Sequence, residues 1–266
     1  MADTPIWSRF DEIASYYDTN FLLTRNPARR LVDLADAAPG RQVLEVGCGT
    51  GFATFLLAEA ITPTGSLLAT DIAEKMISVG RGNAERDGVE NIEFKVMDGA
   101  QLDVKDSSFD LVLCCHALFG FPDIPKALAE WRRVLRPDGT VAFSTISSQF
   151  NFWVQPEVLR VITKYLEMSP PVAGPLDTPG KCSDMLESAG FVDIEVVEED
   201  LGYSYRNIDE FWNEISSSLF RLSLDTLDAK TVETMKMDFA DALSNEFDGG
   251  GMYRSNPTIL SKARKG

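Results

Sequence analysis

The chain has 266 residues, of which 44% are hydrophobic and 25% charged, and its formal net charge is −16. This composition excludes disordered and fibrous classes, and the length suits one large α/β domain, with or without a modest cap. The acidic balance argues against a nucleic-acid partner and against an anionic membrane surface, because both require a basic face.

The first part of the chain alternates short apolar runs with helical patterns. The N-terminal stretch 7–23 has helical spacing, and the run 109–115 is almost wholly apolar, as a parallel strand covered on both faces should be. Strands that alternate with helices predict a parallel sheet with right-handed crossovers. The expected strands are 42–46, 66–70, 92–96, 109–115 and 140–146, and the expected helices are 52–60, 73–86 and 124–135.

The rest of the chain is less regular. A helix at 180–189 is followed by a strand at 192–198, and a last strand is expected at 258–263. Helical spacing recurs at 209–220 and 229–243. These elements extend the alternating region, and the sequence shows no internal repeat.

A glycine-rich turn follows the first strand of the alternating region. Gly47, Gly49 and Gly51 are separated by Cys48 and Thr50, and a helical pattern comes next. Glycines permit a sharp turn and let a ligand approach the main chain, so this strand–turn–helix indicates a nucleotide-cofactor site. The spacing is GxGxG and differs from the GxGxxG of dinucleotide-binding proteins, whose helix N-terminus holds a pyrophosphate.

Acidic residues lie next to this turn and at the ends of the following two strands. Glu45 precedes the turn, Asp71 ends the second strand, and Asp98 ends the third. Ligands of such sheets bind outside the carboxyl ends of the strands, so Asp71 can accept both ribose hydroxyls of a cofactor and Asp98 an adenine amino group. Taken singly, the glycines would make a tight loop and the aspartates helix N-caps. Their joint order and spacing favour a cofactor site.

This set of motifs resembles the class I S-adenosylmethionine (SAM)-dependent methyltransferases. The similarity is greatest to the branch with ubiquinone- and menaquinone-biosynthesis enzymes and many natural-product methyltransferases. It covers roughly 10–146 and, loosely, the last strand. It implies a doubly wound, Rossmann-like, seven-stranded and mostly parallel sheet with helices on both faces and a helical cap. The matching segments are 10–18, 45–51, 70–76, 98–100, 108–112 and 133–139.

The resemblance also implies which residues hold SAM. The turn would contact the methionine part, Asp71 the ribose, and the residues after the second and third strands the adenine. The end of the fourth strand would approach the sulfonium, while Tyr17 closes over the cofactor. The implied cofactor-binding residues are Tyr17, Glu45, Gly47, Cys48, Gly49, Asp71, Ile72, Met76, Asp98, Gly99, Ala100, Cys115 and His116.

The same resemblance suggests how a single domain spanning 1–266 is organised. Residues 1–35 are expected to form an N-terminal helical lid, and residues 36–147 the cofactor-binding core. Two insertions, 148–178 and 206–250, are expected to form the cap.

His116 is the sole histidine of the chain and follows the fourth strand directly. The ordinary pKa of histidine suits proton removal near neutrality, so His116 is a candidate catalytic base for a substrate hydroxyl. Alternatively, it shapes the pocket or meets SAM through its backbone. Methyl transfer requires alignment rather than a metal or a nucleophile, and no metal site is expected.

The two cap segments are rich in aromatic residues. Phe150, Trp153, Phe211 and Trp212 are candidates for substrate contact, which predicts an apolar or aromatic pocket. At helical spacing, however, most of these side chains are also explained as the cap's own core.

We therefore expect an enzyme of the EC 2.1.1 class that methylates a small, largely apolar molecule on oxygen or carbon, in a setting such as secondary metabolism. N-methylation stays open. Alternatives on the same fold are a SAM-binding cyclase or isomerase and a non-catalytic SAM-binding protein. The sequence has no membrane-spanning apolar run and no signal peptide, and its four cysteines lack a CxxC pair. A cytoplasmic protein with reduced thiols follows, and a homodimer stays open.

Overall fold

The structure is a computed structural model that describes residues 6–20, 22–150, 156–167, 174–247 and 251–266. Its centre is a seven-stranded sheet in the order β3-β2-β1-β4-β5-β9-β6. Neighbouring strands from β3 to β5 are parallel, whereas β9 runs antiparallel to both β5 and β6. This confirms the expected doubly wound, mostly parallel sheet. The strands are β1 (Gln42–Val46), β2 (Ser66–Asp71), β3 (Ile92–Val96), β4 (Phe109–Cys115), β5 (Leu135–Ile146), β6 (Phe191–Asp200) and β9 (Pro257–Lys265).

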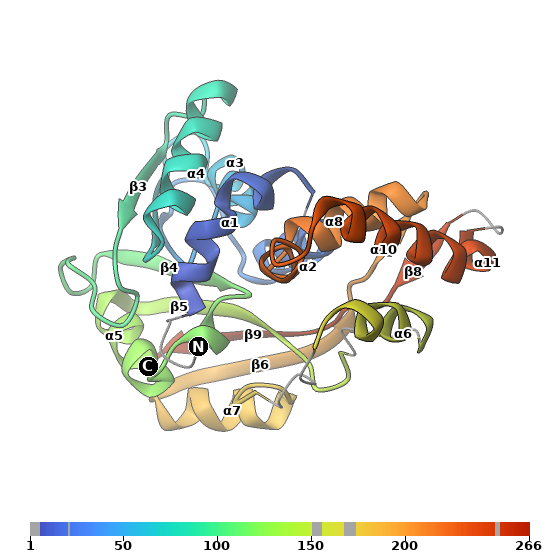
Figure 1. Cartoon of the computed structure of the whole chain (residues 1–266). Helices are drawn as coiled ribbons and strands as arrows, with labels where there is room; N and C mark the ends of the chain where they lie inside the picture. The colour runs from blue at the N-terminus through green and yellow to red at the C-terminus, as the bar shows by residue number, and fades with distance from the viewer. Residues whose placement is uncertain (1–5, 21, 151–155, 168–173, 248–250) are drawn as a thin grey trace.

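Helices cover both faces of this sheet (Figure 1). On one face, α2 (Arg25–Leu34), α3 (Phe52–Ala60) and α4 (Glu74–Asp87) pack their apolar sides on the strands. On the other face lie α5 (Ile124–Val134) and α7 (Pro179–Ser188). Side chains alternate along each strand, and apolar residues such as Val43 and Leu44 of β1 and Leu111 and Val112 of β4 are fully buried on both faces of the sheet.

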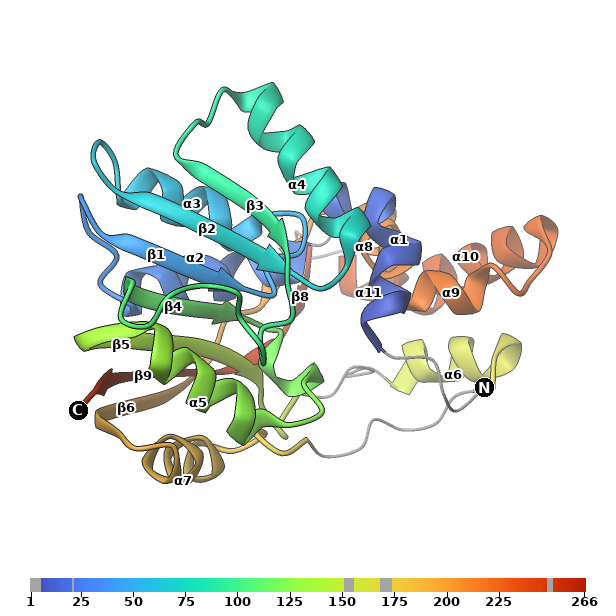
Figure 2. The ribbon, with the colours of Figure 1, turned by 90° about the vertical axis from the view of Figure 1, so that its left-hand side faces the viewer.

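Helix α1 (Ile6–Asn20) and the cap lie beyond the carboxyl ends of the parallel strands (Figure 2). The cap has its own apolar core, centred on buried aromatic side chains such as Phe211 and Phe239. A one-turn helix, η1 (Leu22–Thr24), joins α1 to α2. The cap elements are α6 (Pro156–Tyr165), α8 (Ile208–Ser217), α9 (Phe220–Leu224), α10 (Ala229–Ala242), α11 (Ser244–Phe247) and the two-stranded sheet of β7 (Tyr203–Tyr205) and β8 (Met252–Arg254).

The N-terminal segment divides between two environments. α1 lies over the strand ends, whereas α2 buries Ala28 and Leu31 against the sheet. Within the described part of 1–35, therefore, α2 packs as part of the body, whereas α1 lies over the strand ends. Within the described ranges, no helix is both long and apolar enough to cross a membrane.

The helix expected at 209–220 is two helices in the structure, α8 and α9. The Ser217 hydroxyl donates to the Asn213 carbonyl oxygen (2.6 Å), and the Ser218 hydroxyl donates to the Ile215 carbonyl oxygen (2.7 Å). Such side-chain bonds compete with the helical ladder. Ser218 Oγ then accepts from the Phe220 amide (3.2 Å) at the start of α9, so consecutive serines end one helix and start the next.

Candidate active site

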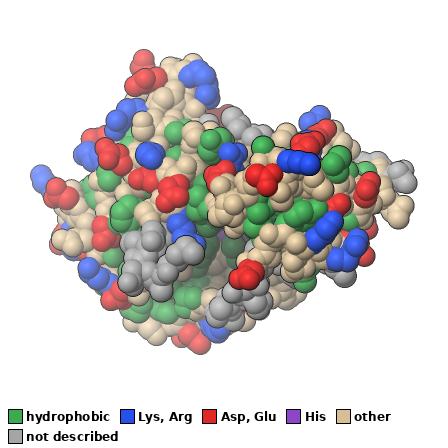
Figure 3. Space-filling view, in the orientation of Figure 1, with side chains coloured by type: hydrophobic (Ala, Val, Ile, Leu, Met, Phe, Trp, Pro, Cys, Tyr) green, Lys and Arg blue, Asp and Glu red, His purple; other side chains and the backbone are tan. Residues whose placement is uncertain are grey.

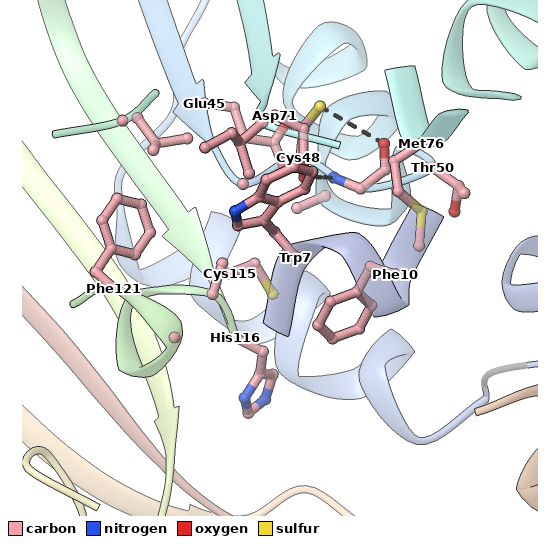
Figure 4. A pocket seen from close by; sticks show the side chains of 18 of the residues that line it. Trp7, Phe10, Glu45, Cys48, Thr50, Asp71, Met76, Cys115, His116 and Phe121 are labelled. Carbon is pink, nitrogen blue, oxygen red and sulfur yellow. Dashed lines mark hydrogen bonds between the residues drawn. The ribbon is translucent and has the colours of Figure 1, made fainter. Parts of the chain in front are cut away.

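A cleft opens at the carboxyl ends of the parallel strands, between the sheet and α1. It encloses about 1160 Å³ of empty space, part of it open to solvent. Figure 3 shows a hollow between the body and the cap, and Figure 4 shows the side chains that line the cleft.

The cleft brings together the residues expected to hold SAM, with one exception. Ala100 is 8% exposed and packs into the core on the α5 side of the sheet, while its amide donates to Asp98 Oδ1 (2.8 Å). Its side chain therefore turns away from the cleft. The other expected cofactor-binding residues line the cleft, and they are Tyr17, Glu45, Gly47, Cys48, Gly49, Asp71, Ile72, Met76, Asp98, Gly99, Cys115 and His116.

The glycine turn has a backbone that other residues rarely adopt. Gly47 has φ +71° and Gly49 has φ +55°, and the amides of Gly47 and Cys48 both donate to the Thr70 carbonyl oxygen (2.8 and 2.9 Å). A Cβ atom added at Gly47 would lie 2.4 Å from Ala117 Cβ. Glycine is thus required at position 47 both for the turn and for its contact with the loop after β4.

Asp71 ties the glycine turn to the start of α4. Its Oδ2 accepts from the Gly49 amide (2.8 Å) and its Oδ1 from the Ala73 amide (2.9 Å). Burial raises the pKa of Asp71, while these amide bonds oppose the rise. An ionised carboxylate has about four acceptor positions, so each oxygen can accept one further hydroxyl.

Glu45 is a buried carboxyl group at the floor of the cleft. It is 1% exposed, and its Oε2 has no hydrogen-bond partner among the residues that the structure describes. Burial raises the pKa of Glu45 to about 8, and the charge of Asp71 adds to the rise. A cationic ligand group would relieve this unfavourable placement.

His116 sits at the opposite side of the cleft from Glu45 and Asp71 (Figure 4). Its backbone is left-handed (φ +49°), and its amide donates to Ser144 Oγ (3.0 Å). Both ring nitrogens are buried and have no hydrogen-bond partner within the described part of the chain. Burial lowers the pKa of His116 to about 4, so the ring is neutral at pH 7. The neighbouring Cys115 thiol has a pKa raised to about 12 by burial and is not a thiolate.

Aromatic side chains that the sequence analysis did not assign complete the cleft. Trp7 and Phe10 come from α1 and Phe52 from α3. Phe119 comes from the one-turn helix η2 (Leu118–Gly120) after β4, and Phe121 follows that helix. The sequence does contain a signal for the placement of Trp7 and Phe10. Trp7, Phe10 and Tyr17 are spaced by three and seven residues and so share one face of α1.

The aromatic residues suggested for substrate contact are not brought to the cleft. Phe211 and Trp212 are 3% and 7% exposed and pack in the cap core, with the Phe211 ring 6.3 Å from that of Phe239. Phe150 lies beside the Arg254 guanidinium, 5.8 Å from its carbon, and outside the cleft lining. Trp153 lies outside the described residues. The apolar spacing of α8 serves the cap interior instead.

Comparison with known proteins shows the family. A family model for a methyltransferase domain (Methyltransf_31) matches residues 37–190, more than half of the chain. The chain is 34% identical over 208 residues to the nocamycin O-methyltransferase of Saccharothrix syringae, covering 72% of this chain and 74% of that one. It is 30% identical over 206 residues to the demethylmenaquinone methyltransferase of Geobacillus stearothermophilus, covering 70% and 88%.

Solved structures share the fold at lower sequence identity. The [4+2]-cyclase SpnF aligns over 89% of this chain and 81% of its own, with a TM-score of 0.57 and 18% identity. The chain belongs to the class I SAM-dependent methyltransferases. It is therefore an enzyme of the EC 2.1.1 class with SAM as methyl donor, as the sequence motifs predicted.

Proposed function

We propose that the protein transfers the methyl group of SAM to an oxygen atom of a small, largely apolar acceptor that lies between His116 and α1. The observation that carries this proposal is the character of the cleft around His116. The imidazole lies across from Phe10 (Figure 4), and both of its buried nitrogens lack a hydrogen-bond partner among the described residues. Trp7 and Phe119 supply further apolar wall. The relatives named above act, by their names, on small molecules.

We propose that SAM lies along the strand ends, where the described contacts suit each of its parts. The carboxylate of Glu45 suits the ammonium group of the methionine part, next to the main chain of Gly47 and Gly49. The free acceptor positions of Asp71 suit the ribose hydroxyls, and Asp98 suits the adenine amine. The side chains of Ile72 and Met76, with Gly99 behind, would flank the adenine ring.

The reaction needs little from the protein beyond alignment and the removal of one proton. SAM supplies a methyl group that is already electrophilic. The cleft holds the acceptor oxygen in line with it and excludes water, and such positioning can supply up to roughly 7–11 kcal/mol in the best cases. A neutral His116 can accept the hydroxyl proton as the new carbon–oxygen bond forms. Because burial keeps the pKa of His116 near 4, the imidazole is a weak base. An acidic hydroxyl, such as a phenol, an enol or a carboxylic acid, is therefore the acceptor that it suits best.

Incubation with SAM labelled in its methyl group tests this assignment. Acceptors would be apolar phenols, enols and carboxylic acids, each paired with its own methyl ether or ester as a blocked control. We expect label in a product bond between oxygen and methyl, with one S-adenosylhomocysteine released per product. Label on carbon would refute O-methylation. A substrate rearranged without release of S-adenosylhomocysteine would instead establish cyclase or isomerase chemistry.

Replacement of His116 by asparagine tests its role. Asparagine tolerates the left-handed backbone at this position, so the loop should keep its shape. We expect kcat to fall by about 100-fold, the lower end of what general bases contribute, with the Kd for SAM within about twofold of wild type. In the wild type, loss of the base on acidification should occur near pH 4 and not near 6.5. A wild-type kcat in His116→Asn would exclude the base.

A second test follows from the raised pKa of Glu45. At pH 7 a carboxyl group of pKa about 8 is mostly protonated, whereas a bound ammonium group would favour its ionised form. We expect SAM binding at pH 7 to release on the order of one proton, measured calorimetrically in buffers of different ionisation enthalpy. Glu45→Gln should abolish this release. An equal proton release in Glu45→Gln would place the titrating group elsewhere.

A further inference from the structure

We propose that three buried polar residues of the cap region, Glu214, Arg254 and Asn256, form a latch that positions α1 over the cofactor. We call these three residues the lid latch. None of them lines the cleft, so they are positioning residues rather than catalytic ones. The inference rests on the placement of SAM proposed above, because α1 supplies part of the wall of that site.

The lid latch forms hydrogen bonds with the main chain just after the end of α1. The Leu22 amide donates to Glu214 Oε2 (3.2 Å), and Asn256 Nδ2 donates to the Leu23 carbonyl oxygen (3.0 Å). Both bonds are buried and join segments far apart in the sequence. Buried hydrogen bonds to the main chain fix direction as well as distance, so they define where η1 lies against the cap.

The cap side of the latch is itself held in place. Glu214 is 1% exposed, Arg254 8% and Asn256 4%. Arg254 Nη1 lies 3.7 Å from Glu214 Oε1, and the Asn256 amide donates to Asp200 Oδ1 (2.7 Å). A buried ion pair contributes little net stability, because desolvation offsets its attraction. We therefore assign to the Glu214–Arg254 pair a role in fixing the geometry of the segment after α1 rather than in stabilising the fold.

Helix α1 also packs directly against α4 and against the cap. Ile13 and Ala14 pack against Ala73 and Met76 of the α4 segment, a small apolar contact beside the cofactor wall. Asp11 Oδ1 accepts from an amide in the first turn of α4 (2.8 Å), but that bond is exposed. On the cap side, Leu219 and Leu222 pack against the same cluster, and the Arg221 guanidinium carbon lies 4.4 Å from the Tyr16 ring centroid. To these apolar and exposed contacts the lid latch adds buried, directional hydrogen bonds just after the carboxyl end of α1.

Hydrogen exchange of the full-length chain, with and without SAM, tests the latch. The variants are Glu214→Ala and Asn256→Ala. Matched controls on α8 are Asp209→Asn, whose side chain is 67% exposed in an ion pair with Lys236, and Asn213→Ala, an exposed position. Removing one partner of a buried hydrogen bond leaves the other partner unpaired, which corresponds to about a tenfold change in an equilibrium. We expect about tenfold faster exchange across 6–24 in the latch variants, and a similar rise in the Kd for SAM.

The control measurements separate a loosened lid from a damaged fold. Exchange in β1, β4 and β5 should stay at the wild-type rate in every variant, since none of these strands contacts the latch bonds described. Lid exchange and SAM affinity equal to those of the controls, in both latch variants, would overturn the proposal. If Glu214→Ala does not fold, Asn256→Ala decides between the same two results. Neither readout needs a methyl acceptor, so a failure to methylate any acceptor would refute the proposed function and leave this test unaffected.

Discussion

Replacement of Gly47 by alanine is expected to lower SAM affinity by at least about 100-fold, or about 2.7 kcal/mol. The new Cβ atom would lie 2.4 Å from Ala117 Cβ, well inside van der Waals contact. It would also force a left-handed conformation (φ +71°) on alanine. Either the turn or the loop after β4 must move. Both line the cleft, so the surface proposed for the methionine part of SAM is lost.

Two variants distinguish this local effect from general damage. Gly82 lies exposed in α4, and a Cβ there would meet nothing within 4 Å, so Gly82→Ala should bind SAM normally. The double variant Gly47→Ala with Ala117→Gly removes the clash but keeps the backbone strain, which amounts to about 1–3 kcal/mol. We expect it to recover part of the lost affinity, measured by calorimetry on folded protein. Wild-type affinity in Gly47→Ala would show that the turn is not the cofactor surface.

The body of the fold could be predicted because its signals are local. Strand runs such as 109–115 are almost wholly apolar, since both faces of the sheet are covered. The glycine turn, Asp71 and Asp98 could be placed together because parallel strands present their carboxyl ends at one edge. Ala100 was assigned to the site by resemblance alone, and the bond from its amide to Asp98 turns its side chain into the core.

The cap could not be predicted to the same depth, because the positions of its side chains are determined by contacts between residues that are distant in sequence. The aromatic spacing of α8 looks the same whether Phe211 and Trp212 face a substrate or a cap core, and the cap core is their place in the structure. Glu214 carries no local signal either, since its hydrogen bond reaches across to Leu22 at the other end of the chain.

The second large effect is expected at Asp71. Its two carboxylate oxygens each accept a main-chain amide, from Gly49 and from Ala73, so the side chain both shapes the turn and offers acceptors to the ribose. Asparagine has one acceptor oxygen, and its NH2 group would face one of these donor amides. Hydrogen bonds to charged groups contribute roughly 1.5–3 kcal/mol each, so Asp71→Asn should weaken SAM binding by about 100-fold or more.

Asp98→Asn provides the matched comparison for this prediction. Asp98 accepts one amide, that of Ala100, and its side chain is exposed, so the amide oxygen of asparagine can keep that bond. We therefore expect a loss of affinity of about tenfold or less for Asp98→Asn, measured by the same titration. Equal losses in the two variants would mean that charge at the strand ends, and not the paired acceptor geometry of Asp71, determines cofactor binding. A larger loss of affinity at Asp71 would establish that one carboxylate both shapes the glycine turn and accepts the ribose hydroxyls. The residue that binds the ribose of SAM would then also hold the turn that contacts the methionine part.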